Sequence, residues 1–204
     1  MLEYTAKLPT SSTRYNISGG NWNSEYQVTS DGAVIYHVKN SSPSQDKPDL
    51  TFYSGASTDG SVAGSGKFVR FSSNIQLSLA DPSQPSTTTS VCLNKKGIIS
   101  TRYTLQMTIE GQARSLAWKN TEMNDSFGPS ASHKLVDEAN EVLAVFSPGG
   151  GRVQKDGVLE VFVDYGTQFD LMALIGALAL REKSRKTNFG PIDVASSPAS
   201  TTGY

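Results

Sequence analysis

The sequence predicts a single, mainly β domain whose many short strands wrap one unusually apolar helix near the C-terminus. Three observations support this prediction. Apolar and polar residues alternate along many short segments, residues 171–180 carry no charge, and the length of 204 residues fits one domain. We expect residues 1–186 to form the domain. Residues 187–204, rich in Ser, Thr, Pro and Gly, are expected to form a disordered tail.

The clearest strand covers residues 103–109, where apolar and polar side chains alternate strictly, as in a half-buried strand. A turn at 110–112 then leads into a segment in which Leu116 and Trp118 share one face, which predicts a hairpin. Further strands between turns are expected at residues 26–30, 33–39, 50–53, 67–71, 75–79, 89–93, 114–119, 134–136, 142–146 and 158–164. Strands at such spacing indicate a sandwich or a barrel. The polar segments 40–49 and 80–89 are expected to be exposed loops.

The helix is expected at residues 167–186. Thr167 followed by Asp170 is a variant of the capping box. The uncharged run 171–180 is apolar on nearly every face, which predicts burial on all sides. A bilayer span needs about 20 such residues, so a core helix enclosed by protein is favoured over a membrane anchor. Gly176 is tolerated in mid-helix if a strand approaches closely there. Cations at a helix C-terminus complement the macrodipole, which accounts for Arg181, Lys183, Arg185 and Lys186.

The formal net charge is -1, so the domain as a whole has no electrostatic attraction to nucleic acid or to anionic membranes. Any such contact needs a local basic patch. We therefore expect no nucleic-acid partner.

The single cysteine, Cys92, cannot form an internal disulfide, which argues against a secreted, disulfide-stapled scaffold. Residues 1–7 lack the layout of a signal peptide. Without an export signal, the sequons at Asn16, Asn40 and Asn124 are expected to be chance matches in polar loops. We expect an intracellular, cytoplasmic protein with no transmembrane segment. Peripheral attachment to a membrane stays open.

No catalytic or metal-binding group of residues stands out, and no cofactor is expected. Residues 61–68 resemble a phosphate-binding loop, but Phe68 replaces the required Ser or Thr and the following residues favour a strand. A hairpin tip is the better interpretation. His37, His133 and Cys92 lack zinc-ligand spacing. A Cys–His catalytic pair is formally open, but a small cysteine in a strand is more often core packing.

The basic residues offer one binding hypothesis. Lys95 and Lys96 precede a turn at Gly97, while Lys67 and Arg70 flank a strand. If they converge on one rim, they are suited to an anionic headgroup, with Arg152 and Lys155 as further candidates beside the glycine-rich turn. The competing interpretation is an ordinary solvated surface of mixed charge.

The C-terminal segments carry a resemblance to a known group. Residues 134–137, 142–146, 157–163 and 170–186, in that order, are two strands, a Gly-Val-Leu-Glu strand and the apolar helix. This order resembles the tubby C-terminal-like superfamily, which includes the LURP-one-related proteins and the phospholipid scramblases. The most similar members are small fungal domains of unknown function. The resemblance implies a closed antiparallel barrel of about twelve strands around a central hydrophobic helix. It also implies lipid binding, since tubby domains bind phosphoinositide headgroups, although none of their basic residues can be matched here.

The leading hypothesis is a non-enzymatic binding module for anionic lipid headgroups, such as phosphoinositides, or for a protein partner. One alternative is an enzyme with a strand-built site that uses His37, His133 or Glu160. Another is a carbohydrate-binding β-scaffold that uses aromatic residues expected in loops, namely Tyr15, Trp22 and Tyr26.

Overall fold

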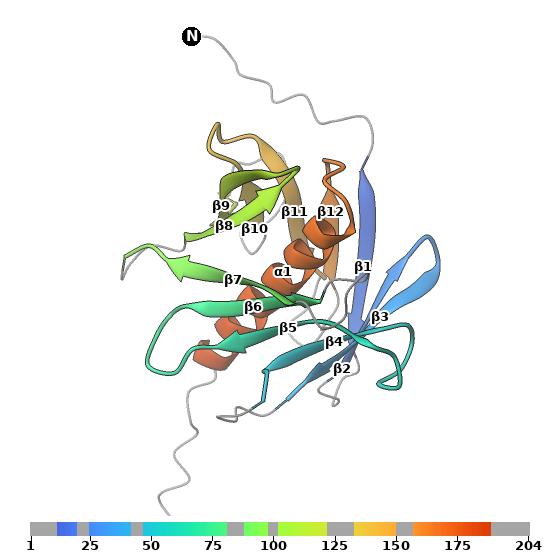
Figure 1. The fold of residues 1–204 in the computed structure, drawn as a ribbon. Coiled ribbons are helices and arrows are strands. Elements are labelled where there is room, and N and C mark those ends of the chain that lie inside the picture. The colour runs from blue at the N-terminus through green and yellow to red at the C-terminus, as the bar shows by residue number, and fades with distance from the viewer. Residues whose placement is uncertain are drawn as a thin grey trace, which may run out of the picture.

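The computed structural model describes residues 12–19, 25–41, 47–80, 88–97, 102–121, 133–149 and 157–188, with side chains as far as residue 185. In these residues twelve strands precede a single helix (Figure 1). The strands are β1 (Thr13–Gly19), β2 (Glu25–Ser30), β3 (Ala33–Asn40), β4 (Leu50–Ser54), β5 (Val62–Phe68), β6 (Ile75–Ala80), β7 (Thr88–Lys95), β8 (Tyr103–Ile109), β9 (Gln112–Asn120), β10 (His133–Val136), β11 (Val142–Pro148) and β12 (Gly157–Val161). The helix is α1 (Thr167–Asn188).

Each strand pairs antiparallel with its neighbours in sequence, and β1 pairs with β12 to close the barrel. Tyr15 on β1 lies opposite Leu159 on β12 in this closing pair. Closure leaves no strand edge unpaired among these twelve strands. The predicted fold class, a closed antiparallel barrel of about twelve strands with one C-terminal helix, is confirmed.

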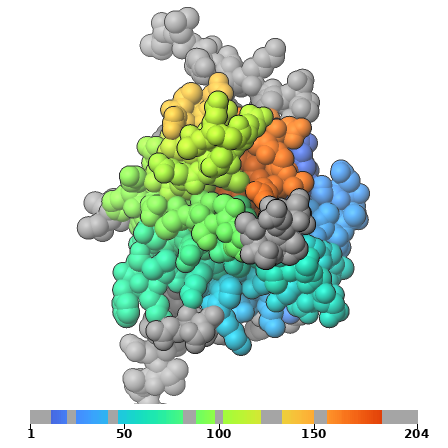
Figure 2. Space-filling model, in the orientation of Figure 1, coloured from blue at the N-terminus to red at the C-terminus, as the bar shows by residue number. Residues whose placement is uncertain are grey.

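The helix α1 lies inside the barrel (Figure 1). Its residues from Leu171 to Leu180 are all buried, and its side chains meet strands on several sides. Ile175 faces β5, and Gly176 faces Trp118 on β9 and Leu93 on β7. The space-filling view shows strand residues covering most of the helix on this face (Figure 2). The predicted burial on every side is confirmed, and the interior is filled by the helix.

Residues 61–68 were expected to be a hairpin tip, and that prediction is wrong. They form β5, whose glycines at positions 64 and 66 face the helix. A Cβ atom at Gly64 would lie 2.6 Å from Cδ1 of Ile175. The glycines therefore allow α1 to approach the wall closely, which a flexible tip does not require.

Three further details differ from the prediction. The first strand, β1, was not predicted, and the strand expected at 67–71 is the end of β5 followed by a turn. The helix continues to Asn188, two residues into the segment expected to be a tail.

The predicted loops at 40–49 and 80–89 are shorter than expected, because Asn40 ends β3, Ala80 ends β6 and β7 begins at Thr88. Residues 42–46 and 81–87, and the rest of the tail, lie outside the described residues.

Candidate functional site

Strand direction alternates around the barrel, so successive chain connections fall at its two opposite ends. The last turns of α1 mark one of them, because Nζ of Lys183 lies 3.2 Å from the backbone oxygens of Ser72 and Asn74 in the β5–β6 turn. Basic residues gather at this end, which we call the basic end. Its described members are Lys39, Lys47, Lys67, Arg70, Lys95, Lys96, Arg102, Arg181, Lys183 and Arg185. Lys119 on β9 and Lys134 on β10 also lie near this end of their strands, and Nζ of Lys119 reaches back along the wall to Oδ1 of Asn140 at 2.5 Å.

Few described carboxylates accompany these cations. Glu25, Asp49 and Glu182 lie at the basic end, but Asp49 is only 4% exposed and Glu182 only 2%. Both buried carboxylates accept hydrogen bonds from groups within the fold. Asp49 accepts a hydrogen bond of 2.8 Å from the backbone N–H of Phe68, and Glu182 is held by the neighbours described below. Among the described residues, positive charge therefore dominates the surface of this end.

The opposite end of the barrel, where α1 begins, has the reverse character, and we call it the acidic end. Its described cations are Arg14, which forms an exposed ion pair of 3.6 Å with Glu160, and Arg114. Its described carboxylates are Asp31, Asp59, Glu110, Asp137, Glu138, Glu141, Glu160, Asp164 and Asp170. Although the net charge of the chain is only -1, the charges of the described residues are thus separated along the barrel axis.

The four predicted binding residues, Lys67, Arg70, Lys95 and Lys96, all lie at the basic end. Lys67 is near the end of β5, Arg70 is in the β5–β6 turn, and Lys95 ends β7 beside that turn. The backbone N–H of Lys95 donates a hydrogen bond of 3.2 Å to the side-chain oxygen of Asn74. The structure therefore brings β5, the β5–β6 turn and the end of β7 into one region. The further candidates Arg152 and Lys155 lie outside the described residues.

Lys183 completes this region from inside the barrel. Its ammonium group donates to the turn and lies 5.9 Å from the centroid of the Phe68 ring. Burial lowers the pKa of Lys183, the positive charge of Lys95 lowers it further, and Asp49 acts in the opposite direction. Lys183 on the helix and Lys95 on the barrel wall are therefore close enough for their positive charges to repel each other.

The end of α1 is anchored by its buried carboxylate, Glu182. The hydroxyl of Tyr26 on β2 donates to it in a short hydrogen bond. Asn40 Nδ2 and Arg185 Nη1 each donate to it at 2.6 Å. Burial and the charge of Glu182 raise the pKa of Tyr26. These groups satisfy one another, so we assign the cluster to fixing the helix in the barrel.

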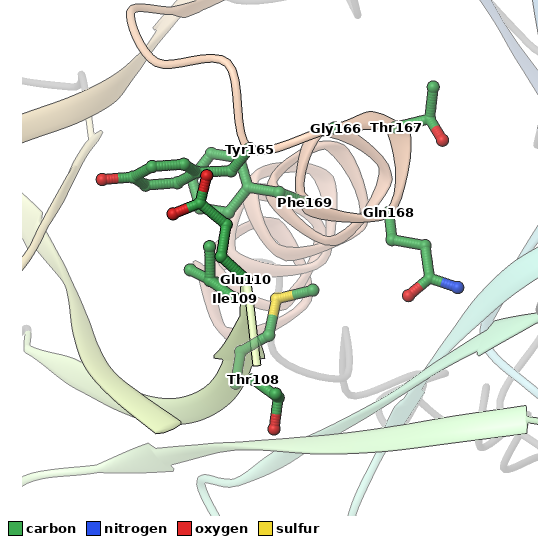
Figure 3. Close-up of a pocket in the computed structure, with 9 residues that line it drawn as sticks. Thr108, Ile109, Glu110, Tyr165, Gly166, Thr167, Gln168 and Phe169 are labelled. Atoms are coloured by element: carbon green, nitrogen blue, oxygen red, sulfur yellow. The ribbon is translucent and has the colours of Figure 1, made fainter. Parts of the chain in front are cut away.

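The acidic end holds a hollow of about 320 Å³ beside the first turn of α1. Tyr165 and Glu110 lie on one side of it and Gln168 on the other (Figure 3). Nearby, Asp170 accepts a hydrogen bond of 2.5 Å from the hydroxyl of Tyr15, and burial raises its pKa. With Glu110 lining it, the hollow is poorly suited to an anion.

The residues of the enzyme alternative do not converge. His37 and His133 lie on β3 and β10, which are separated around the barrel by β2, β1, β12 and β11. His37 Nε2 lies 3.8 Å from Glu25, and Glu160 pairs with Arg14. No group of three or more His, Cys, Asp or Glu side chains in the described part of the chain is placed to hold a metal ion.

Cys92 was expected to pack in the core, and that expectation is wrong. Its side chain is exposed on β7, where Sγ donates a hydrogen bond of 3.4 Å to Oδ1 of Asn94. The alternation along β7 explains this placement. Val91 and Leu93 point inward and are buried, so the residue between them points outward.

The aromatic residues proposed for carbohydrate binding were expected in loops, but two of them are buried in strands. Tyr15 and Tyr26 point into the barrel and bond the helix carboxylates Asp170 and Glu182. Trp22 lies outside the described residues. The sequons at Asn16 and Asn40 likewise fall in strands rather than in polar loops.

Several residues at the basic end were not proposed for binding from the sequence, and three of them matter for the site, namely Phe71, Arg102 and Lys183. Lys183 was explained by the helix dipole, and Phe71 was assigned to a strand. The backbone N–H of Lys96 donates to the carbonyl oxygen of Arg102 at 2.9 Å, which places Arg102 beside the predicted lysines. Counting the connections between strands could have placed these residues together, because in an all-antiparallel barrel every second connection lies at the same end.

No helix within the described residues is long and apolar enough to cross a membrane. Comparison of the chain with protein-family models, with curated proteins and with solved structures finds no match.

Proposed function

We propose that this protein is a non-enzymatic module that binds anionic phospholipid headgroups through its basic end. The observation that carries the proposal is the separation of charge along the barrel, with Lys67, Arg70, Lys95 and Lys96 at one end. A cluster of cations attracts the anionic face of a membrane even when the protein as a whole is nearly neutral. The acidic end favours a single orientation, because it is repelled by the same surface.

The size of the electrostatic attraction per cation is consistent with reversible binding. Each Lys or Arg close to an anionic bilayer contributes about 1 kcal/mol, and this attraction decays over a Debye length of about 8 Å at physiological ionic strength. Several cations of one rim must therefore approach the surface together. The proposed location is accordingly peripheral, at the surface of an intracellular membrane.

The resemblance to the tubby C-terminal-like superfamily supports the proposal by analogy. The closed barrel with a helix inside it is the arrangement that the resemblance implies. Members of that superfamily bind phosphoinositide headgroups at the barrel surface. A shared fold alone does not establish a shared function, so the weight of the proposal rests on the charges of this chain.

Co-sedimentation with vesicles tests the proposal. We expect binding to phosphatidylcholine vesicles that contain phosphatidylserine or a phosphoinositide, and little binding to pure phosphatidylcholine. Replacing Lys95 and Lys96 together by Glu should abolish the difference. Binding that is equal for neutral and anionic vesicles, and unchanged by this double substitution, would contradict the proposal.

A matched control separates a local site from a general charge effect. Lys96→Glu and Arg14→Glu change the net charge equally, but they act at the basic and the acidic end respectively. Lys96→Glu should weaken binding to anionic vesicles, whereas Arg14→Glu should leave it nearly unchanged. Equal losses would show that only the net charge matters and that the basic end is no binding site.

A further inference from the structure

The β5–β6 turn carries an exposed apolar tip at the basic end. Of the large hydrophobic residues that the structure describes, Val62, Val69 and Phe71 are exposed, and Phe71 is completely so, at 107% of its reference area. Val69 and Phe71 flank Arg70 in this turn. A lone exposed valine is ordinary. Two apolar side chains around a cation, within a basic surface, form a specific combination.

The backbone of Phe71 shows that folding alone does not favour this residue. Phe71 has a φ of +55°, a conformation that glycine or asparagine adopts readily and that is unusual for a bulky side chain. The other described non-glycine residues with positive φ are Asp31, Glu110 and Asn140, all of them polar. The ring of Phe71 gains no burial in return. A strained, exposed aromatic residue is therefore a candidate for a role outside the fold.

The turn that carries Phe71 is firmly held. The backbone N–H of Ser72 donates to the carbonyl oxygen of Val69 at 3.3 Å, and the N–H of Val69 donates to that of Asn74 at 3.2 Å. From inside the barrel, Lys183 Nζ bonds the carbonyl oxygens of Ser72 and Asn74. These hydrogen bonds hold the turn that carries Phe71. The turn between β5 and β6 lies at the same end of the barrel as the last turn of α1 (Figure 1).

We infer that Phe71, together with Val69, inserts into the interfacial layer of an anionic bilayer while the surrounding cations hold the headgroups. This inference rests on the proposed function and makes it specific: the ligand is a lipid surface rather than a soluble phosphate compound. Exposed Phe and Leu side chains of surface-bound proteins are buried at the boundary between the lipid headgroups and the acyl chains. One apolar anchor beside a basic cluster supplies the two weak signals that reversible membrane attachment combines. The axis of α1 then points its C-terminal end toward the membrane.

Fluorescence of a tryptophan at the tip tests insertion directly. With Phe71→Trp, phosphatidylserine-containing vesicles should shift the emission of the new tryptophan to the blue, and brominated acyl chains should quench it. The spectrum of the unsubstituted protein is subtracted to remove the two native tryptophans. Val62→Trp is the matched control, because Val62 is also exposed but begins β5 at the acidic end. It should show neither effect.

Removing the ring tests its contribution to affinity. Phe71→Gly should weaken binding to anionic vesicles by about tenfold or more, the expected loss of one buried aromatic side chain. Its melting temperature should be unchanged or higher, so a folding defect cannot account for the loss. Binding of a soluble inositol phosphate should not change.

The outcomes separate the two proposals. If vesicles bind in a Lys95- and Lys96-dependent manner while Phe71→Trp shows no shift and Phe71→Gly binds normally, the insertion is refuted and the headgroup site stands. A soluble inositol phosphate that binds as tightly as the vesicles also refutes insertion. If anionic vesicles do not bind at all, both proposals fail.

Discussion

Gly176 of α1 lies directly against the indole of Trp118 on β9, at the centre of the barrel. A Cβ atom at position 176 would meet Nε1 of Trp118 at 2.9 Å. Trp118 is completely buried, so its ring has no room to move aside. Glycine in mid-helix costs about 1 kcal/mol relative to alanine. The close approach of helix and strand explains why it is nevertheless present.

Gly176→Ala should therefore destabilise the protein although alanine is the better helix former. Overpacking of a filled core costs about 1–3 kcal/mol, which equals or exceeds the gain in helix propensity of about 1 kcal/mol. Urea denaturation followed by circular dichroism measures the change in the free energy of unfolding.

A second substitution identifies the cause. Trp118→Phe removes the Nε1 atom that a Cβ at position 176 would meet, so Gly176→Ala should cost less in that background than in the native chain. A double-mutant cycle measures the difference. If the cost of Gly176→Ala is the same in both backgrounds, the contact with Trp118 is not the reason for the glycine.

The anchor of the helix end gives a second prediction. Glu182→Ala should lower the free energy of unfolding by about 1–3 kcal/mol, the cost of leaving buried hydrogen-bond donors without their acceptor. The substitution removes the acceptor used by Tyr26 and Asn40. It also removes the ion-pair partner of Arg185, but the Arg185 side chain is 42% exposed, so the ion pair itself contributes little. Chemical denaturation of the variant measures the loss.

Glu160→Ala is a suitable control for this substitution. Glu160 pairs with Arg14 on the outer wall, and both side chains are exposed, so the pair should contribute no more than about 1 kcal/mol. Equal losses for Glu182→Ala and Glu160→Ala would show that the buried cluster does not anchor the helix.

The pKa of Tyr26 predicts a loss of stability at alkaline pH. Burial raises that pKa in the folded protein, and the charge of Glu182 raises it further. Below about pH 10, the ordinary tyrosine value, both states keep the proton and the stabilisation is fully present. Above it the unfolded chain releases the proton while the folded protein retains it. The free energy of unfolding then falls by up to about 1.4 kcal/mol per pH unit for this residue.

Tyr26→Phe tests the assignment. At neutral pH the variant should be less stable by about 1–3 kcal/mol, because Glu182 loses a buried hydrogen-bond donor. The stability difference from the native protein should shrink as the pH rises above about 10. Urea denaturation at several pH values measures both curves. Curves that stay parallel would assign the alkaline loss to other tyrosines, such as Tyr15, whose pKa is also raised by burial and by Asp170.

Much of the fold could be predicted because its signals are local. Alternation located most of the strands, and the uncharged run 171–180 located the helix and its burial on all sides. The prediction of a hairpin tip at residues 61–68 was wrong because the glycines and serines of this segment are typical of a turn. The glycines are needed because Ile175 of the helix packs closely against Gly64. Such a contact between distant segments cannot be recognised from the local sequence of a strand.

The candidate site could be predicted only in part. Lys67, Arg70, Lys95 and Lys96 were recognised as cations that would matter if they converged, but convergence depends on strand direction. The net charge of -1 concealed the two charged ends, because it sums over them. Phe71 was missed because it continued an apparent strand. Its positive φ and its full exposure are properties of the folded turn.

That turn gives the last prediction, which concerns stability alone. Phe71→Gly relieves the left-handed backbone conformation, which costs an L-residue about 1–2 kcal/mol. Glycine also makes the unfolded chain more flexible, which removes about 0.5–1 kcal/mol of that gain. The free energy of unfolding should therefore stay the same or rise by up to about 1.5 kcal/mol. Phe71→Ala removes the same ring but keeps a Cβ atom, so it should give no such gain. Thermal and urea denaturation of the two variants compare them directly. If Phe71→Gly proves less stable than Phe71→Ala, the ring is not strained by its turn, and its presence at the tip needs no explanation outside the fold.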